Sequence, residues 1–349
     1  MSAAKKASKK KSETAYAAAG VDLQLGNSVK SGIGDQVKGT HRPEVLSSVG
    51  GFGGLFDARF KKYQHPVLVT SIDGVGTKLK VASMMMKHDT IGSDLVNHCI
   101  DDIAVLGAEP LFFLDYLGTS SLDPGTFSQI LSGMTSACAN SKCALIGGET
   151  AQMPGLYHGD DYDLVGTIVG IVDKKKMITG KKIKAGDVLV GFPSSGLHTN
   201  GFSLARSILF KELRLKVTDG LPGTRQTIGE ALLATHVNYQ PMLKKLSRHV
   251  TYKGLAHITG GGFVDNIPRI LPKNVDVEIQ IGSWKMPPIF RFLQEKSRVS
   301  PEELYHVFNM GIGMVAIVSP KDAVRILDKT TSWIIGSVVP GKGVTKLKF

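Results

Sequence analysis

The stretch DGVGTK sets a carboxylate, two glycines and a lysine directly behind a predicted strand. The glycines let backbone N–H groups approach an oxyanion, the lysine adds a positive charge, and the carboxylate can hold Mg²⁺ against phosphate oxygens. The stretch therefore suits contact with a nucleoside triphosphate, and the candidate contacts are Asp73, Gly74, Gly76, Thr77 and Lys78. Taken alone, the same six residues are more typical of a tight turn with a solvated Asp and Lys.

Neither a Walker A box nor a G-x-G-x-x-G turn that opens a helix after a strand occurs in the chain. A bound nucleotide would therefore depend on further acids, because Mg²⁺ usually takes one or two carboxylates beside phosphate and water oxygens. Such acids occur on a predicted helix and after a second predicted strand.

Residues 91–107, IGSDLVNHCIDDIAVLG, predict an amphipathic helix. Asp102 falls on its apolar side, where an unpaired charge would cost several kcal/mol, so we expect a metal, a cation or several N–H donors beside it. Asp94, His98 and Asp101 project from the other side, and we expect Asp101 to be a surface acid. An Asp102 bonded to neighbouring backbone at the margin of the core is the alternative.

Glu149 follows a short apolar strand and the two glycines Gly147 and Gly148. The same elements meet at Asp73: an apolar strand, an acid, and small residues where the backbone must come close to something. Together, Asp73, Asp102 and Glu149 predict a site for Mg²⁺ and phosphate, although each acid alone is a weak signal.

Three further glycine-rich stretches could contact ligands. VGGFGGLF, which contains Gly53, is typical of a lid over a ligand and equally of a turn-rich connector. PSSGLHTNGFSLAR and HITGGGFVDNIPR each precede a predicted helix, whose N-terminus presents free N–H groups to phosphate. His198 and His257 at these entries are as typical of packed structural histidines as of catalytic ones. The candidate substrate contacts are Ser195, Gly196, His198, Asn200, Thr259, Gly260, Gly261 and Gly262.

Composition narrows the class of protein. The chain has 349 residues and a formal charge of +12, but five of its lysines lie within the first eleven residues, so the charge of the body is modest. We therefore expect no nucleic-acid partner and regard a basic nucleic-acid-binding protein as a remote alternative. Three cysteines without metal-ligand spacing indicate free thiols in a reducing compartment, and no membrane-spanning or secretory segment is evident, so we expect a cytoplasmic protein.

Apolar strand-like runs alternate with helical patterns along both halves of the chain, which predicts α+β or α/β units with helices covering sheets. The lysine-rich stretch DKKKMITGKKIKAGD suggests a connector between two domains. We expect a disordered tail at 1–18, an N-terminal domain at 19–173 with a mixed sheet, and a C-terminal α/β sandwich domain at 174–349.

These segments together resemble the phosphoribosylformylglycinamidine cyclo-ligase family, also called aminoimidazole ribonucleotide synthetase. The resemblance covers nearly all of the chain except the lysine tail. It runs through GGFGGLF, DGVGTKLKVA, HDTIGSDLVNHCIDDIAVLGAEPLFFLDYLG, GGETAQMPGLYHGDDYDLVG, SSGLHTNGFSLAR, HITGGGFVDNIPR and FNMGIGM. GAEPLFFLDY and the order of the blocks make it far more specific than a single motif.

The resemblance implies an enzyme of purine biosynthesis that uses ATP and Mg²⁺ to close the ring of formylglycinamidine ribonucleotide. It implies metal and nucleotide acids at Asp73, Asp102 and Glu149, a phosphate-facing Lys78, and a catalytic role nearest to His198. It also implies a homodimer formed through the N-terminal domain, which carries the nucleotide site.

Two positions depart from the family pattern: Asp101 stands where many relatives have Asn, and Gly34 where a lysine is common. Relatives with the same ATP-binding architecture, such as thiamine-monophosphate kinase, differ in the second substrate, so likeness of fold alone would not choose between them.

Overall fold

The structure is a computed structural model that describes residues 33–48 and 50–349. The predicted tail at 1–18 lies outside the described residues. Buried apolar side chains from both halves of the chain form one continuous core cluster, so the two halves pack against each other. Within the described residues, no helix combines the length and the apolar character needed to cross a membrane.

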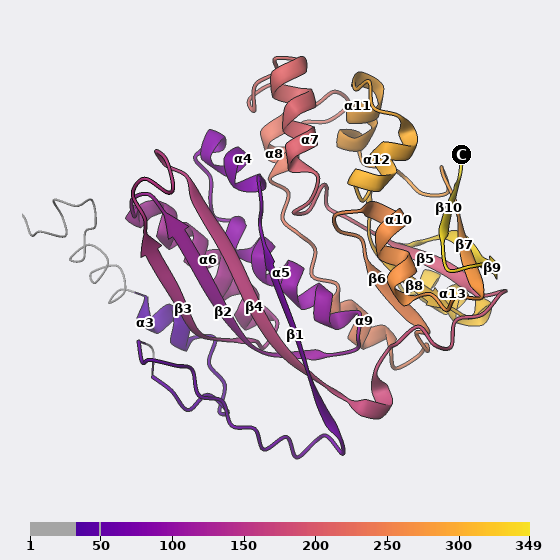
Figure 1. The fold of residues 1–349 in the computed structure, drawn as a ribbon, viewed down its shortest axis with the longest axis horizontal. Helices are drawn as coiled ribbons and strands as arrows, with labels where there is room; N and C mark the ends of the chain where they lie inside the picture. The colour runs from indigo at the N-terminus through magenta and orange to yellow at the C-terminus, as the bar shows by residue number, and fades with distance from the viewer. Residues whose placement is uncertain (1–32, 49) are drawn as a thin grey trace, which may run out of the picture.

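The N-terminal half is built on a four-stranded sheet (Figure 1). Its strands follow the order β1 (Pro66–Gly74), β4 (Tyr162–Asp173), β2 (Glu109–Thr119) and β3 (Ala144–Gln152). β4 runs antiparallel to both of its neighbours, whereas β2 and β3 are parallel. The sheet is therefore mixed, as the sequence predicts.

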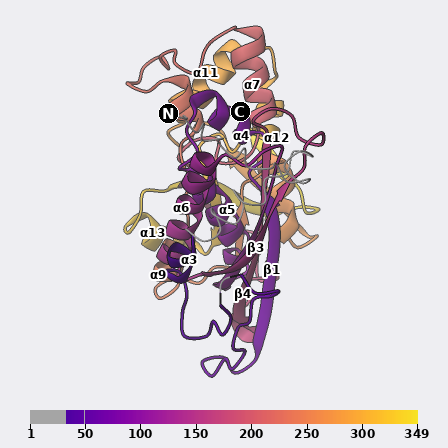
Figure 2. The same cartoon turned by 90° about the vertical axis from the view of Figure 1, so that its left-hand side faces the viewer.

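Helices cover one face of this sheet, which Figure 2 shows with α5 and α6 on one side of the strands. They are α3 (Gly34–Lys38), α5 (Ile91–Ala104) and α6 (Pro124–Asn140), whereas α4 (Lys78–Met85) packs against a helix of the C-terminal half. On β1 the exposed positions alternate with partly buried ones, and the exposed ones include Leu68 and Ile72. The second face of the sheet thus carries apolar side chains that no residue within 33–48 or 50–349 covers.

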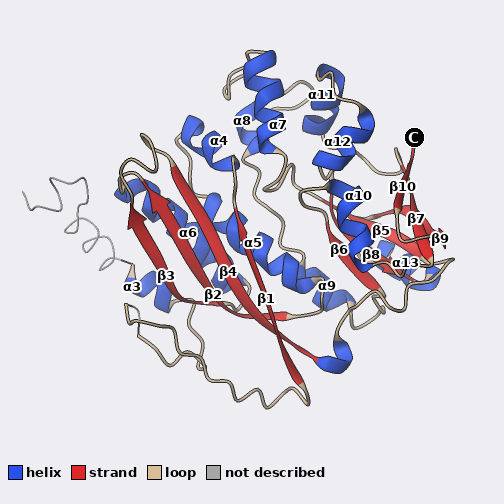
Figure 3. Ribbon diagram, in the orientation of Figure 1, coloured by secondary structure: helices blue, strands red, loops and turns tan. Residues whose placement is uncertain are grey.

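The C-terminal half holds a six-stranded sheet at the other end of the molecule (Figure 3). Its order is β10 (Thr345–Lys348), β7 (Val275–Gln280), β9 (Trp333–Pro340), β5 (Val188–Pro193), β8 (Ile312–Val318) and β6 (Gly254–His257). Every residue of β8 is buried, as expected for a central strand covered on both faces. The surrounding helices are α7 (Phe202–Arg206), α8 (Ile228–Leu232), α9 (Gln240–Leu246), α10 (Gly262–Asn266), α11 (Pro288–Lys296), α12 (Pro301–Val307) and α13 (Pro320–Leu327).

The predicted mixed α and β architecture is confirmed, and the predicted strand-like runs fall on β1 to β9. The short edge strand β10 and helix α4 were not predicted. α4 begins at Lys78, so the lysine expected in a loop is the first residue of a helix. The connector begins with a short 3₁₀ turn, Lys174–Lys176, and the next strand starts at Val188. The exact domain boundary stays a prediction.

Candidate active site

Helix α5 lies at the junction of the two halves, and both sides of it are buried. Asp94, His98 and Asp101 are each at most 1% exposed. The prediction that Asp101 is a surface acid is therefore wrong. The polar side of α5 does not face water, because the chain segment between α8 and α9 covers it. Asp102 is the more accessible acid, with its side chain 24% exposed.

Asp94 and Asp101 hold that covering segment through its backbone. Asp94 Oδ1 accepts the N–H of His236 at 2.7 Å, and Asp101 Oδ1 accepts the N–H of Tyr239 at 2.8 Å. Burial raises the pKa of Asp101 well above its usual value, although the Tyr239 N–H acts in the opposite direction. These two acids bind the halves of the molecule together and are closed to solvent.

Lys78 takes part in the same junction. Its Nζ lies 2.8 Å from Asp94 Oδ2 and donates to the carbonyl of Ala234 at 2.8 Å, and both charged side chains are fully buried. The structure therefore corrects the expectation of a phosphate-facing lysine. The charge of Lys78 is neutralised inside the protein rather than presented to a ligand.

Asp73, His98, Asp102 and His257 form a group that we call the junction cluster. His98 Nε2 lies 2.9 Å from Asp73 Oδ2 and 3.8 Å from Asp102 Oδ2, so one ring connects the end of β1 to α5. Asp102 also accepts the N–H of His257 Nδ1 at 2.9 Å and the hydroxyl of Ser71 at 3.0 Å. The structure thus brings Asp73 and Asp102 together.

Charges within the junction cluster support one another. Burial disfavours the charged imidazole, but the hydrogen bond to Asp73 and the charge of Asp102 outweigh it and raise the pKa of His98. Burial would raise the pKa of Asp73, yet the bond and charge of His98 lower it. Burial is likewise outweighed at Asp102, whose pKa is lowered by His257 and His98. Both carboxylates therefore stay ionised near neutral pH.

The third predicted acid does not join this cluster within one chain. Asp73 pairs with Gly166 on β4, Gly166 pairs with Asp115 on β2, and Asp115 pairs with Gly148 on β3. Glu149 is one residue further and so points to the opposite face of the sheet. It also stands three strand positions from β1, or about 14 Å. The predicted convergence of three acids is therefore wrong for a single chain.

Asp115 is an acid that the sequence reading missed. It stands inside the apolar run LFFLDYLG, and this setting is the signal that could have identified it. Burial raises the pKa of Asp115 to about 7. A Cβ on Gly148 would come within 2.2 Å of Asp115 Oδ1, so the acid accounts for a glycine there without any ligand.

The predicted substrate loop at Ser195–Asn200 adjoins the junction cluster. Thr199 Oγ1 lies 2.6 Å from His98 Nδ1, which joins the loop to α5. His198 is buried in a left-handed backbone conformation, and its Nε2 accepts the Ser195 N–H at 3.3 Å. Gly196 accepts from the amide of Asn309 at 2.9 Å. The loop is thus held in place by defined bonds.

The second predicted loop, Thr259–Gly262, starts just beyond β6 and His257. Gly261 and Gly262 both have a positive φ, and a Cβ on Gly262 would lie 2.1 Å from the carbonyl oxygen of Tyr305. Packing against α12 therefore explains Gly262 without any ligand. Gly260 lies beside Asn200, whose Oδ1 would be 3.2 Å from an added Cβ, so the two predicted loops meet.

The other predicted nucleotide contacts lie in different places. Gly53 is exposed in the stretch before β1, and Gly147 follows the buried start of β3. Gly74 is the last residue of β1, Gly76 lies between β1 and α4, and Thr77 Oγ1 is 3.1 Å from Ser203 Oγ on α7. The DGVGTK stretch therefore does reach the C-terminal half.

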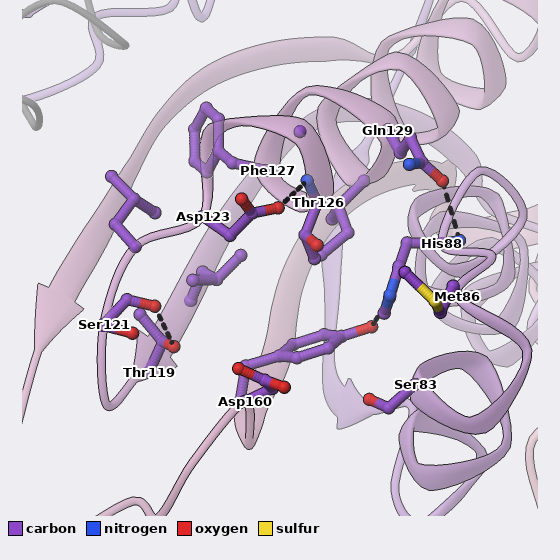
Figure 4. Close-up of a pocket in the computed structure, with 15 residues that line it drawn as sticks. Ser83, Met86, His88, Thr119, Ser121, Asp123, Thr126, Phe127, Gln129 and Asp160 are labelled. Carbon is purple, nitrogen blue, oxygen red and sulfur yellow. Dashed lines mark hydrogen bonds between the residues drawn. The ribbon is translucent and has the colours of Figure 1, made fainter.

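A cavity of about 370 Å³ lies elsewhere, between α4, α6 and the end of β2 (Figure 4). His88 Nδ1 lies 2.8 Å from the hydroxyl of Tyr162, and the backbone N–H of His88 donates to Gln129 at 2.9 Å. Asp123 accepts the N–H of Thr126 at the start of α6. These polar groups satisfy one another, so the cavity itself indicates no ligand.

Comparison with known proteins assigns the family. Residues 57–172 match the N-terminal domain, and residues 184–347 the C-terminal domain, of AIR synthase related protein. The chain is 49% identical over 336 residues to the phosphoribosylformylglycinamidine cyclo-ligase of Geobacillus thermodenitrificans, covering 95% of this chain and 97% of that protein. It is 49% identical over 331 residues to the enzyme of that name from Alkaliphilus oremlandii, covering 93% and 97%.

Solved structures share the fold at low sequence identity. The hydrogenase maturation protein HypE of E. coli has a TM-score of 0.66 at 17% identity, covering 93% of each chain. Thiamine-monophosphate kinase of Stenotrophomonas maltophilia has a TM-score of 0.65 at 16% identity, covering 90% of this chain and 95% of that one. With both domains matched in order and nearly half of all residues identical to curated relatives, the chain belongs to the AIR synthase related family.

Proposed function

We propose that this chain catalyses the ATP-dependent cyclisation of formylglycinamidine ribonucleotide to aminoimidazole ribonucleotide, with release of ADP and phosphate, in purine biosynthesis. The observation that carries the proposal is the 49% identity over almost the full length of cyclo-ligases. The junction cluster supports it, because it sets two ionised, accessible carboxylates beside a loop held by the C-terminal half.

The reaction needs activation of a poor leaving group. The γ-phosphoryl group of ATP passes to the formyl oxygen of the substrate, and an amidine nitrogen of the same molecule then attacks the formyl carbon. A C–N bond forms, the C–O bond breaks, and the oxygen leaves with the phosphate. Because the nucleophile is tethered, the protein gains most from correct positioning and from neutralising the charge of the triphosphate.

Asp73 and Asp102 are the residues that would hold Mg²⁺. Their oxygens are the donor type that Mg²⁺ prefers, and their side chains are 44% and 24% exposed, so both can reach a ligand. Mg²⁺ would supply charge neutralisation of the phosphates. His98 connects the two carboxylates, and His257 orients Asp102. Neither Lys78 nor Glu149 of the same chain is available for this task.

We assign the substrate to the side of the site formed by the two glycine-containing loops. Ser195, Gly196, His198 and Asn200 lie on one loop, and Thr259, Gly260 and Gly261 on the other. His198 is buried, so in this conformation its ring does not contact a substrate. Its role would be to position the loop that carries it. We place the reaction in the cytoplasm, since Cys99, Cys138 and Cys143 are free, buried thiols.

The uncovered face of the four-stranded sheet supports a homodimer. Leu68 is 60% and Ile72 66% exposed on this face, and Leu114 and Thr167 share a row with Ile72. A second copy packed face to face would bury these side chains. Ile72→Lys should shift the protein towards monomer in sedimentation velocity, whereas Val324→Lys, which alters an exposed apolar residue on α13, should not. Equal behaviour of the two variants would contradict this interface.

The function is tested by substrate choice. Purified chain is incubated with Mg-ATP and either formylglycinamidine ribonucleotide or thiamine monophosphate, and release of ADP is followed. We expect turnover with the first substrate alone, and the product should be aminoimidazole ribonucleotide. Turnover with thiamine monophosphate would favour the second candidate, a kinase of the kind whose fold the chain shares. ATP hydrolysis with neither substrate would reject both.

A further inference from the structure

Thr199 contacts both halves of the molecule. It is a buried residue of the loop Ser195–Asn200, which belongs to the C-terminal half. Its Oγ1 lies 2.6 Å from Nδ1 of His98, a buried residue of α5 in the N-terminal half. The contact is a hydrogen bond in either protonation state of the ring, because a hydroxyl can donate to a neutral imidazole or accept from a charged one.

The opposite side of the His98 ring faces an acid of the proposed Mg²⁺ site. His98 Nε2 lies 2.9 Å from Asp73 Oδ2. A ring that is bonded at both nitrogens cannot turn without losing one of these bonds. Thr199 therefore fixes the orientation of the ring, and the ring in turn holds one oxygen of Asp73.

Thr199 also contacts the segments at both ends of this hydrogen-bond chain. Asn200 Nδ2, a predicted substrate contact, donates to Thr199 Oγ1 at 3.2 Å. On the nucleotide side, a Cβ on Gly76 would lie 3.9 Å from the carbonyl oxygen of Thr199, so the DGVGTK stretch packs against the same residue. Thr199 thus lies between the candidate substrate contacts and the candidate nucleotide contacts.

We propose that Thr199 is a positioning residue that couples the substrate loop to the nucleotide acids through His98. The identity of the two ligands rests on the proposed function. A substrate bound at Asn200 would hold the Thr199 hydroxyl against His98, and His98 would hold Asp73 in place for Mg-nucleotide. Substrate should therefore raise the affinity for nucleotide, and by linkage nucleotide should raise the affinity for substrate by the same factor.

The backbone of the loop is suited to such a role. His198, the residue before Thr199, has a left-handed φ of 63°. This conformation is unfavourable for a residue other than glycine, so contacts with the rest of the protein must hold it. The hydrogen bond from Thr199 to His98 is one of these contacts, and its loss should release both the loop and the ring.

The test measures nucleotide binding at equilibrium, without turnover. The full chain is titrated in a calorimeter with β,γ-methylene ATP and MgCl₂, first alone and then with saturating formylglycinamidine ribonucleotide. In the wild type we expect the substrate to tighten binding of the analogue at least about fivefold. Thr199→Val keeps the shape of the side chain and removes the hydroxyl. It should weaken binding of the analogue and abolish the response to substrate.

Two further variants separate coupling from a merely structural hydrogen bond. Thr199→Ser keeps the hydroxyl and should retain both the affinity and the response to substrate. Thr135→Val removes a hydroxyl of α6 that donates to the carbonyl of Leu131, and Thr135 is as buried as Thr199, at 8% and 7% exposed. It should bind and respond as the wild type does. A serine variant that behaves like the valine variant would overturn the proposal.

A double mutant shows whether Thr199 acts through His98. In a His98→Gln background, Thr199→Val should cause no further loss of affinity, because the ring that it positions is already absent. A full additional loss would contradict this route. Thermal melts establish that each variant is folded, and Thr199→Ala replaces the valine variant if valine prevents folding.

The outcomes distinguish this inference from the proposed function. If the wild type turns over formylglycinamidine ribonucleotide but shows no coupling, or if folded Thr199→Val binds and responds as the wild type does, this inference fails and the function stands. If the wild type does not bind that substrate but Thr199→Val still weakens binding of the analogue, the function fails and the link from Thr199 to the nucleotide acids stands. A wild type that binds no analogue would overturn both.

Discussion

Asp73 on β1 and Asp115 on β2 stand in one row across the four-stranded sheet, since each pairs with Gly166 on the strand between them. Asp73 has His98 at 2.9 Å, which outweighs burial and lowers the pKa of the acid. Among the described residues no cation pairs with Asp115, and burial raises its pKa to about 7. Position in the sheet alone therefore does not make a cation site. Whether the acid stays ionised depends on the side chain that the covering helix places beside it.

The largest expected effect concerns the ionised acids of the junction. Asp73→Asn and Asp102→Asn should each lower turnover at least about a hundredfold, or ~2.7 kcal/mol of transition-state stabilisation, because each removes a charge that would hold Mg²⁺. Steady-state ADP release measures this, with near-UV circular dichroism as the control for folding. Turnover within a few-fold of the wild type in either folded variant would remove that acid from the proposed site.

A buried and an exposed lysine on α4 should contribute differently to the free energy of unfolding. Lys78 is fully buried against Asp94, whereas Lys80, two residues later, pairs with Asp161 at the surface. Lys78→Met should lower the free energy of unfolding by about 3–5 kcal/mol, since it leaves the charge of Asp94 buried and unpaired. Lys80→Met should cost about 0–1 kcal/mol.

Urea unfolding of both lysine variants measures the difference. Equal losses would show that Lys78 is not the structural residue that its burial indicates, and would reopen a role for it at phosphate.

The buried carboxyl group of Asp115 should make the free energy of unfolding depend on pH. Its folded pKa of about 7 lies above the usual 3.8, so the folded state holds the proton more tightly than the unfolded state. The free energy of unfolding should therefore fall as the pH rises from about 4 to about 7, and Asp115→Asn should lack this component. Urea unfolding at several pH values across this window tests it. Parallel pH profiles of variant and wild type would mean that Asp115 is not kept protonated.

The smallest effect is expected at Glu149, which points away from the junction. Glu149→Gln should reduce turnover only a few-fold, because within one chain its carboxylate lies about three strand spacings from Asp73. The same ADP assay applies. A loss as large as that of Asp73→Asn would instead show that pairing of two copies through the uncovered face brings Glu149 to the site.

Much of the fold was predictable because its signals are local. The apolar runs of β1 and β4 and the amphipathic pattern of α5 follow from side-chain periodicity. An acid on the apolar side of a helix needs a partner, and Asp102 does lie, with Asp73, against His98, while the role of the two acids in holding Mg²⁺ stays a prediction.

Other features had no local signal. Asp101 has the sequence pattern of a surface residue, but in the folded chain the segment of Tyr239 covers it. The residues next to His236 in the sequence do not predict its contact with His257. Glu149 and Asp73 share one sequence pattern, but alternation along the strand sets them on opposite faces, and the order of strands sets them three strand positions apart.

The sequence by itself determined strands β1 to β9, most of the longer helices and the family, because these depend on local periodicity and on the order of motifs. Only the tertiary structure decided which acids stay accessible, where the charge of Lys78 goes, and that Thr199 of one half meets His98 of the other. Those outcomes depend on which surface of one half covers which helix of the other, and the free energy of burying or pairing a charge is set by that contact.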